Sequence, residues 1–156
     1  MTLANMTAQE TLQHNTDYCR HIADELDLVA LGRLYECPYC AHDIDLEELD
    51  PVEQEALENG EELECPSCGH AVEFEQVDAL QWLEGVLDIE YTVSSNMEYR
   101  GANVCVAFGG PSVYVDTRHG RVNLYWWGDS ASSNLSGAAC DALDEALHDL
   151  YECHRY

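Results

Sequence analysis

Apolar residues recur at helical spacing between Leu12 and Val29, and this pattern predicts a long N-terminal helix. Thr7 and Glu10 form a capping-box pattern at its start, in which Thr7 caps the first turn and Glu10 reaches back. Gly32 is expected to end the helix. We expect the helix to brace the segment that follows it rather than to serve as a docking helix. Its apolar face is predicted to contain Leu12, Tyr18, Cys19, Ile22, Leu26 and Val29.

A short second helix is predicted by the residues around Pro51. Asp50 suits the N-cap, Pro51 the first helical position and Glu53 the third, so the helix is expected to run from Pro51 to about Asn59. Gly60 stops it. This helix and its flanks are acidic. The carboxylates are Asp43, Asp45, Glu47, Glu48 and Asp50 before the helix, Glu53, Glu55 and Glu58 on it, and Glu61, Glu62 and Glu64 after it.

The pattern changes after Phe74. Helical spacing returns first, at Val77, Leu80, Leu83 and Leu87 with Trp82 and Val86. Alternating or continuous apolar runs then predict strands at 89–93, 103–108, 112–116 and 122–127. Glycine-containing turns separate the last three runs at hairpin distances, which favours an antiparallel meander.

A C-terminal helix is predicted from about Ser136 to about Cys153. Its apolar face is formed by Ala139, Leu143, Leu147, Leu150 and Tyr151, and its other face by Asp141, Asp144, Glu145, Asp149 and Glu152. We expect the region after Phe74 to fold independently around Leu80, Leu83, Val104, Val106, Val113, Val115, Leu124, Leu143 and Leu147.

Two Cys-x-x-Cys pairs carry the strongest chemical signal in the chain. Cys37 and Cys40 form the first pair, and Cys65 and Cys68 form the second, which Gly69 follows. Four thiolates with no open position are typical of one tetrahedral, structural Zn²⁺ ion. Between about Tyr35 and Phe74 the chain resembles zinc-ribbon and rubredoxin-like knuckles, although Ala41 replaces the usual glycine of the first knuckle.

Two other interpretations of these cysteines exist. A rubredoxin-like iron centre would use the same four sulfurs for electron transfer. A redox dithiol would need one pair acting alone in a βαβ setting, which the pattern lacks. His42 and His70 lie just beyond the pairs, and we expect them to be exposed loop residues because four thiolates already complete the site.

Together these elements predict an α+β protein. It has an N-terminal helix and a four-cysteine zinc ribbon with an inserted acidic helix, followed by a small antiparallel sheet flanked by helices. The expected segments are 1–34 for the N-terminal helix, 35–74 for the zinc-ribbon module and 75–156 for the α+β domain.

Charge changes the functional picture. The 156 residues contain no Lys, six Arg and thirty-one acidic residues, which gives a formal net charge of −25. Between Arg33 and Arg100 there are nineteen acidic residues and no Lys or Arg. Such a chain is repelled by phosphate and attracted to surfaces that bind phosphate. Hydrophobic residues make up 46% of the chain, which excludes a disordered composition.

Neither a signal peptide nor a membrane-spanning run is visible, and reduced cysteines suit the cytoplasm, which would be the host cytoplasm for a phage-encoded chain. No established catalytic motif is present. Asp116, Arg118, His119 and Asp129 with Cys105 would need the fold to assemble them. We therefore expect no catalytic residues. Of Tyr125, Trp126 and Trp127, at least one is expected at the surface.

The stretch 109–128 resembles a segment of small acidic proteins from phages and mobile elements, of the anti-CRISPR or anti-restriction type. This resemblance implies a DNA-mimicking inhibitor that occupies the basic nucleic-acid-binding surface of a protein partner, such as a CRISPR effector, and that does not itself bind nucleic acid. The acidic surface expected to bind this partner comprises Glu53, Glu55, Glu58, Glu61, Glu62, Asp141, Asp144 and Glu145.

Two alternatives belong to other functional classes. Proteins of halophiles are also acidic and poor in Lys, so the chain would then be a zinc-ribbon interaction adaptor from an acidic proteome. A rubredoxin-like electron carrier is the second alternative, and bound iron would distinguish it.

Overall fold

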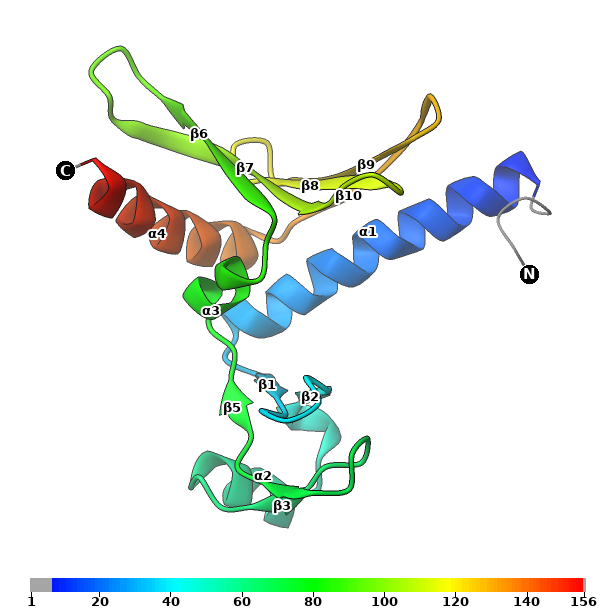
Figure 1. The fold of residues 1–156 in the computed structure, drawn as a ribbon, viewed down its shortest axis with the longest axis vertical. Coiled ribbons are helices and arrows are strands. Elements are labelled where there is room, and N and C mark those ends of the chain that lie inside the picture. The colour runs from blue at the N-terminus through cyan, green and yellow to red at the C-terminus, as the bar shows by residue number, and fades with distance from the viewer. Residues whose placement is uncertain (1–6, 156) are drawn as a thin grey trace.

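Two long helices and a five-stranded sheet form the larger part of the chain in the computed structural model, which describes residues 7–155 (Figure 1). Residues 1–6 and 156 of the predicted terminal segments lie outside the described residues. The N-terminal helix, the small antiparallel sheet and the C-terminal helix confirm the predicted α+β class. The larger part contains α1 (Ala8–Ala30), α3 (Ala79–Glu84), β6 (Asp88–Val93), β7 (Tyr99–Ala107), β8 (Ser112–Asp116), β9 (Arg121–Trp126), β10 (Asp129–Asn134) and α4 (Gly137–His154).

The five strands form an antiparallel meander in the spatial order β10-β9-β8-β7-β6. Alternate residues point into the core, among them Val113 and Val115 of β8 and Val122 and Leu124 of β9, all essentially buried. The four predicted strands are present. The sequence pattern did not predict β10, because Ala131 is its only buried residue and the others are polar.

Helix α1 packs on the sheet. Thr7 and Glu10 make both halves of the capping box at its start. Most of its buried residues, among them Ile22 and Leu26, share one hydrophobic cluster with the inner face of the sheet. The expectation that this helix only braces the cysteine-rich segment is therefore wrong. Leu12 and Tyr18 also differ from the prediction, because their side chains are 53% and 38% exposed.

Helices α1 and α4 cover the same face of the sheet (Figure 1). Leu143 and Leu147 of α4 are buried against that face. Helix α3 is shorter than predicted, and Leu80 is 45% exposed, which corrects its assignment to the core. The short helix instead buries Leu83 and packs Trp82 beside α1, where the Trp82 indole donates a hydrogen bond to Glu25.

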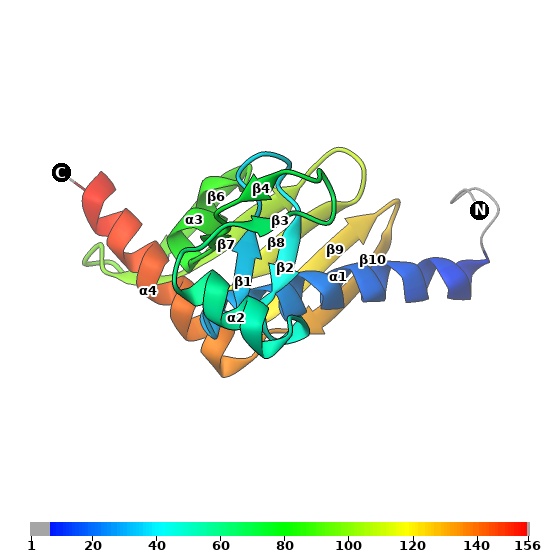
Figure 2. The ribbon, with the colours of Figure 1, turned by 90° about the horizontal axis from the view of Figure 1, so that it is seen from below.

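The remaining residues form a smaller unit, which we call the cysteine module. Its elements are β1 (Leu34–Glu36), β2 (Asp43–Asp45), the 3₁₀ helix η2 (Leu46–Glu48), α2 (Pro51–Glu58), β3 (Leu63–Glu64), β4 (Ala71–Val72) and β5 (Glu75–Gln76). A cluster of Val29, Leu34 and Val77 lies where the chain enters and leaves the module. Seen from below, the module lies in front of the sheet (Figure 2). The predicted segment boundaries stay a prediction.

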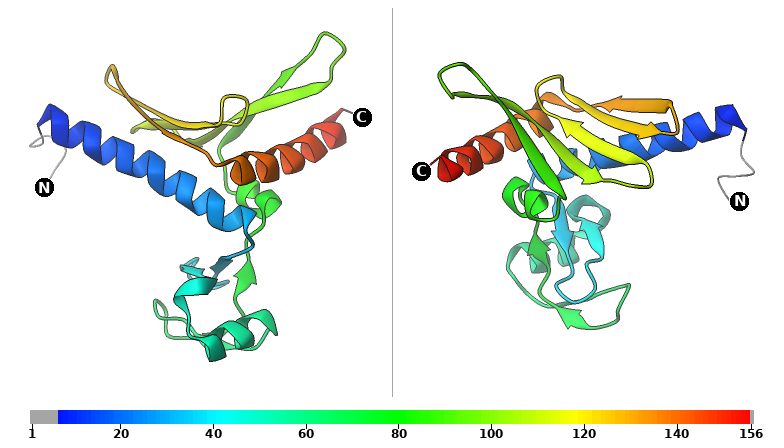
Figure 3. Two further views of the ribbon diagram at one scale, coloured as in Figure 1. Left: turned by 180° about the vertical axis from the view of Figure 1, so that it is seen from behind. Right: turned by 45° about the horizontal axis from the view of Figure 1, so that its top comes forward.

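Helix α2 begins as the sequence predicts, at the N-cap Asp50, whose carboxylate accepts a hydrogen bond from the Glu53 N–H at 2.8 Å. The left view of Figure 3 shows α2 at the far end of the molecule from the sheet. Among residues 7–155, no helix combines the length and apolar composition needed to cross a membrane.

Candidate metal centre

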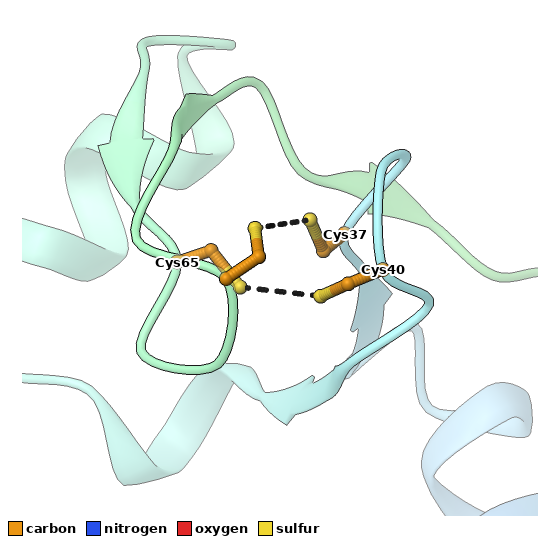
Figure 4. Close-up of side chains that lie close together, drawn as sticks. Cys37, Cys40 and Cys65 are labelled. Carbon is orange, nitrogen blue, oxygen red and sulfur yellow. Dashed lines mark hydrogen bonds between the residues drawn. The ribbon is translucent and has the colours of Figure 1, made fainter.

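Two short hairpins place the four predicted cysteines together. Cys37 and Cys40 lie in the connection between β1 and β2, and Cys65 and Cys68 lie between β3 and β4. Their four sulfur atoms all lie within 4.8 Å of one another. Figure 4 shows the thiols of Cys37 and Cys40 facing the second hairpin. The sequence prediction that these four residues form one group is therefore confirmed, and the group can hold a metal ion.

The backbone folds the same way around each pair. The Cys37 N–H donates to the His42 carbonyl at 2.9 Å, and the Ala41 N–H donates to the Cys37 carbonyl at 3.0 Å. The second hairpin repeats this pattern, with Cys65 donating to His70 and Gly69 donating to Cys65, each at 2.9 Å. This repetition turns all four sulfurs toward one point between the hairpins.

Ala41 takes the same left-handed conformation as its glycine counterpart. Its φ is 60°, and the φ of Gly69 is 76°. This backbone region costs a residue with a Cβ roughly 1–2 kcal/mol. The missing glycine of the first knuckle therefore leaves its geometry unchanged, because hydrogen bonds at both ends of the turn hold Ala41 in the strained conformation.

The distances between sulfur atoms fit a metal site. The Cys37 and Cys68 sulfurs are 3.8 Å apart, and those of Cys40 and Cys65 are 3.6 Å apart. A tetrahedron with metal–sulfur bonds of about 2.3 Å has edges of about 3.8 Å. A disulfide would require about 2.0 Å. The arrangement therefore matches four thiolates around a single ion.

The protein environment favours a thiolate at Cys65. Burial opposes ionisation of its thiol, but the N–H groups of Cys68 and Ser67 stabilise the charged form, and the pKa falls to about 6. At Cys68 the His70 N–H also favours the thiolate, but burial and the neighbouring sulfurs raise the pKa to about 11. A divalent cation would offset this opposition, because its positive charge stabilises thiolates that bind it.

A small apolar core supports the site. Cys37 and Cys65 are buried in one cluster with Tyr35, Leu57, Val72 and Phe74. Leu57 is the one buried residue of α2, so this helix covers the cluster with a single side chain and turns its charged residues outward.

The histidines beside the pairs are not part of the cysteine group. His70 is exposed and stacks on Tyr39 with ring centroids 5.4 Å apart, which links the two knuckles at the surface. His42 is half-buried rather than exposed, which corrects the expectation for that residue.

The predicted acidic residues stand on separate elements. Glu53, Glu55, Glu58, Glu61 and Glu62 lie on α2 or in the loop after it, and Asp141, Asp144 and Glu145 lie on α4. All of them are exposed except Asp144, which is half-buried. The Tyr99 hydroxyl donates to the Asp144 carboxylate at 2.6 Å, and burial together with this carboxylate raises the pKa of Tyr99. Asp144 is therefore engaged within the fold.

The constellation around His119 is only partly assembled. The Asp116 carboxylate accepts hydrogen bonds from the N–H groups of Arg118 and His119 and contacts the His119 ring at 2.7 Å. Asp129 lies near the opposite end of the sheet, because it pairs with Trp126 while Asp116 pairs with Arg121. The contacts at Asp116 are those of a residue that stabilises the β8–β9 turn.

An aromatic surface at the other end of the sheet was only partly predicted. Trp127 is 86% exposed and Tyr125 is 52% exposed, which confirms that at least one residue of the aromatic run stays at the surface. Phe108, 72% exposed, was not recognised as part of the same surface. Its position directly before Gly109 and Gly110, at a hairpin connection, was the available signal.

Comparisons of the chain with protein-family models, with curated proteins and with solved structures gave no match.

Proposed function

We propose that the cysteine group binds one structural Zn²⁺ ion and that the cysteine module is a zinc ribbon with an inserted acidic helix. The four converging sulfurs support this proposal, because a site of four thiolates is closed to substrate and water. Thiolates of this kind need a reducing compartment, so we also propose a cytoplasmic location.

Zinc would give the acidic helix a fixed position. Helix α2 has eight residues and one buried side chain, and isolated helices of that length are unstable in water. The metal links the hairpins before and after α2, and so holds the helix and its carboxylates in one orientation. Rigid display is what a charge-matching surface requires, since ordering flexible side chains costs binding free energy.

We further propose that the protein is a non-enzymatic, acidic binding protein that occupies the basic nucleic-acid-binding surface of a protein partner. One observation carries this proposal. Among residues 7–155, no ion-pair partner lies within reach of the acidic residues of α2 and its following loop or of the exposed acids of α4. Unpaired carboxylates remain available to a cationic surface.

The charge pattern supports mimicry of DNA by physical means. DNA carries closely spaced negative charges along its axis, and proteins that bind it place Lys and Arg opposite them. Here the rows on α2 and α4 offer carboxylates without competing Lys residues. A basic channel would be attracted at long range and blocked once occupied. A CRISPR effector or restriction enzyme is the type of target that the sequence resemblance implies.

The first step of the test is to capture the partner from cell extract at low salt on the immobilised wild-type protein and to identify it. The variant Glu53→Gln/Glu55→Gln/Glu58→Gln removes three charges with little change of shape. With the purified partner, we expect association to slow about ten-fold and to lose part of its salt dependence. Added duplex DNA should compete with the wild-type protein for the partner.

A matched variant, Asp141→Asn/Glu145→Gln/Asp149→Asn, tests the second row and leaves Asp144 in place because Tyr99 binds it. Unchanged binding and salt dependence in both triple variants would rule out the acidic surface as the determinant, and adaptation of a whole proteome to salt would then explain the charge. A captured partner that DNA does not displace would contradict mimicry.

A further inference from the structure

The residues of the turn between β9 and β10 are unfavourable for the type of turn that they form. Trp126 pairs with Asp129, so Trp127 and Gly128 alone form the turn. Both have positive φ, 49° and 84°. Two-residue hairpin turns of this kind favour Asn-Gly, because a bulky side chain in the left-handed region is strained. A tryptophan at this position lowers the stability of the fold. Its side chain is 86% exposed, so the burial of apolar surface offsets little of this cost.

The strained residue belongs to a group of aromatic side chains. We name Phe108, Tyr125, Trp126 and Trp127 the aromatic tip. They line a groove of about 540 Å³ between the β7–β8 and β9–β10 connections, together with Gly109, Gly110 and Asp129. Strain and exposed aromatic rings at one place indicate a binding surface.

The tip stands on a firm base. Trp126 is half-buried and packs against the hydrophobic core of the sheet. The Trp127 ring meets it edge to face, with centroids 5.8 Å apart and an interplanar angle of 89°. This contact restrains the Trp127 ring, so that less conformational entropy is lost when a ligand binds.

Charge decides which occupant suits this groove. Its one charged lining residue, among the residues described, is Asp129. Aromatic faces beside a carboxylate attract a guanidinium or ammonium group through cation–π and ionic interactions, and Arg also stacks flat on the ring. The net charge of −25 opposes a second copy of the chain, nucleic acid and an anionic membrane alike.

We propose that the aromatic tip receives an arginine side chain from a cationic segment of the protein partner. This inference rests on the proposed function and adds to it a specific anchor. The carboxylates of the molecule attract the basic partner over a distance, and the tip then selects Arg over Lys at short range. Trp127 supplies the exposed ring, and Asp129 supplies the counter-charge.

The substitution Trp127→Asn separates binding from folding. Asn-Gly is the preferred pair for this turn, so thermal stability should be unchanged or higher. The probes are a short oligo-arginine peptide and oligo-lysine and oligo-glutamine peptides of the same length. The wild-type protein should bind oligo-arginine most tightly and oligo-glutamine not at all. Trp127→Asn should weaken oligo-arginine binding roughly three- to thirty-fold. It should also reduce the ratio of the oligo-arginine affinity to the oligo-lysine affinity.

The control is Leu31→Asn, which removes a 61% exposed apolar residue at the end of α1. It should leave all three affinities unchanged. The Glu53→Gln/Glu55→Gln/Glu58→Gln variant should weaken oligo-arginine and oligo-lysine binding by the same factor, because it changes charge and leaves the tip intact.

Each contrary result has a separate meaning. If Trp127→Asn and the wild-type protein bind oligo-arginine with equal affinity, the aromatic tip does not bind arginine. The proposed function is not affected by this result. Failure of the wild-type protein to bind either cationic peptide at low salt would contradict the proposed function itself. The wild-type protein and Trp127→Asn are also tested for single-stranded DNA binding and for self-association. If the wild-type protein shows either one and Trp127→Asn loses it, the tip binds nucleic acid or a second copy of the chain, and the arginine proposal is wrong.

Discussion

Replacing Cys65 with Ser is expected to release the proposed metal ion and unfold the cysteine module while the sheet and its two helices stay folded. Cys65 is fully buried, and the module has only a small apolar cluster of its own. Structural zinc contributes on the order of 10 kcal/mol to the folding of such modules. The measurement is zinc content together with hydrogen exchange of residues 35–74.

Tryptophan fluorescence distinguishes unfolding of the larger unit from unfolding of the cysteine module. All three tryptophans, Trp82, Trp126 and Trp127, lie outside the cysteine module, so their emission reports on the larger unit. It should stay native in Cys65→Ser and after treatment with a chelator. The control is Cys153→Ser, which changes an exposed cysteine of α4 and should retain the metal. If tryptophan emission shifts to that of unfolded protein on metal loss, the two parts share one cooperative core.

Leu26→Ala in α1 is expected to destabilise the larger unit by about 3 kcal/mol. Leu26 is 1% exposed and lies in the cluster that α1 shares with the sheet. Truncation leaves a cavity within this cluster. Chemical denaturation followed by tryptophan fluorescence measures the effect.

Leu12→Ala is the matched control in the same helix. Leu12 is 53% exposed, so its truncation should change the unfolding free energy by less than about 0.5 kcal/mol. If Leu26→Ala left the tryptophan transition unchanged and only loosened the cysteine module, the helix would be the simple brace that the sequence pattern suggested.

Local rules explain why much of the fold was predictable. Capping residues set the starts of α1 and α2, and alternating apolar residues set β8 and β9. The four cysteines were predictable as one group because two-residue spacing within each pair restricts the geometry strongly. These features depend on residues close together in sequence.

The remaining features depend on contacts between distant residues. β10 is almost entirely polar, and only its pairing with β9 makes it a strand. Leu80 has the same spacing as buried leucines, but α3 buries Leu83 and packs the half-buried Trp82 against the core instead. Asp144 resembles the other acids of α4 until Tyr99, forty-five residues earlier, donates a hydrogen bond to it. The spacing of hydrophobic residues along the sequence does not predict contacts of this kind.

The proposed fold of the cysteine module and the fixed position of the α2 carboxylates both depend on a bound zinc ion. Elemental analysis of the purified wild-type protein tests for this ion most directly. Cys37, Cys40, Cys65 and Cys68 form one closed group of four sulfurs. We predict one equivalent of zinc per chain and a colourless protein. One equivalent of iron with a red colour, or no bound metal, would contradict the account.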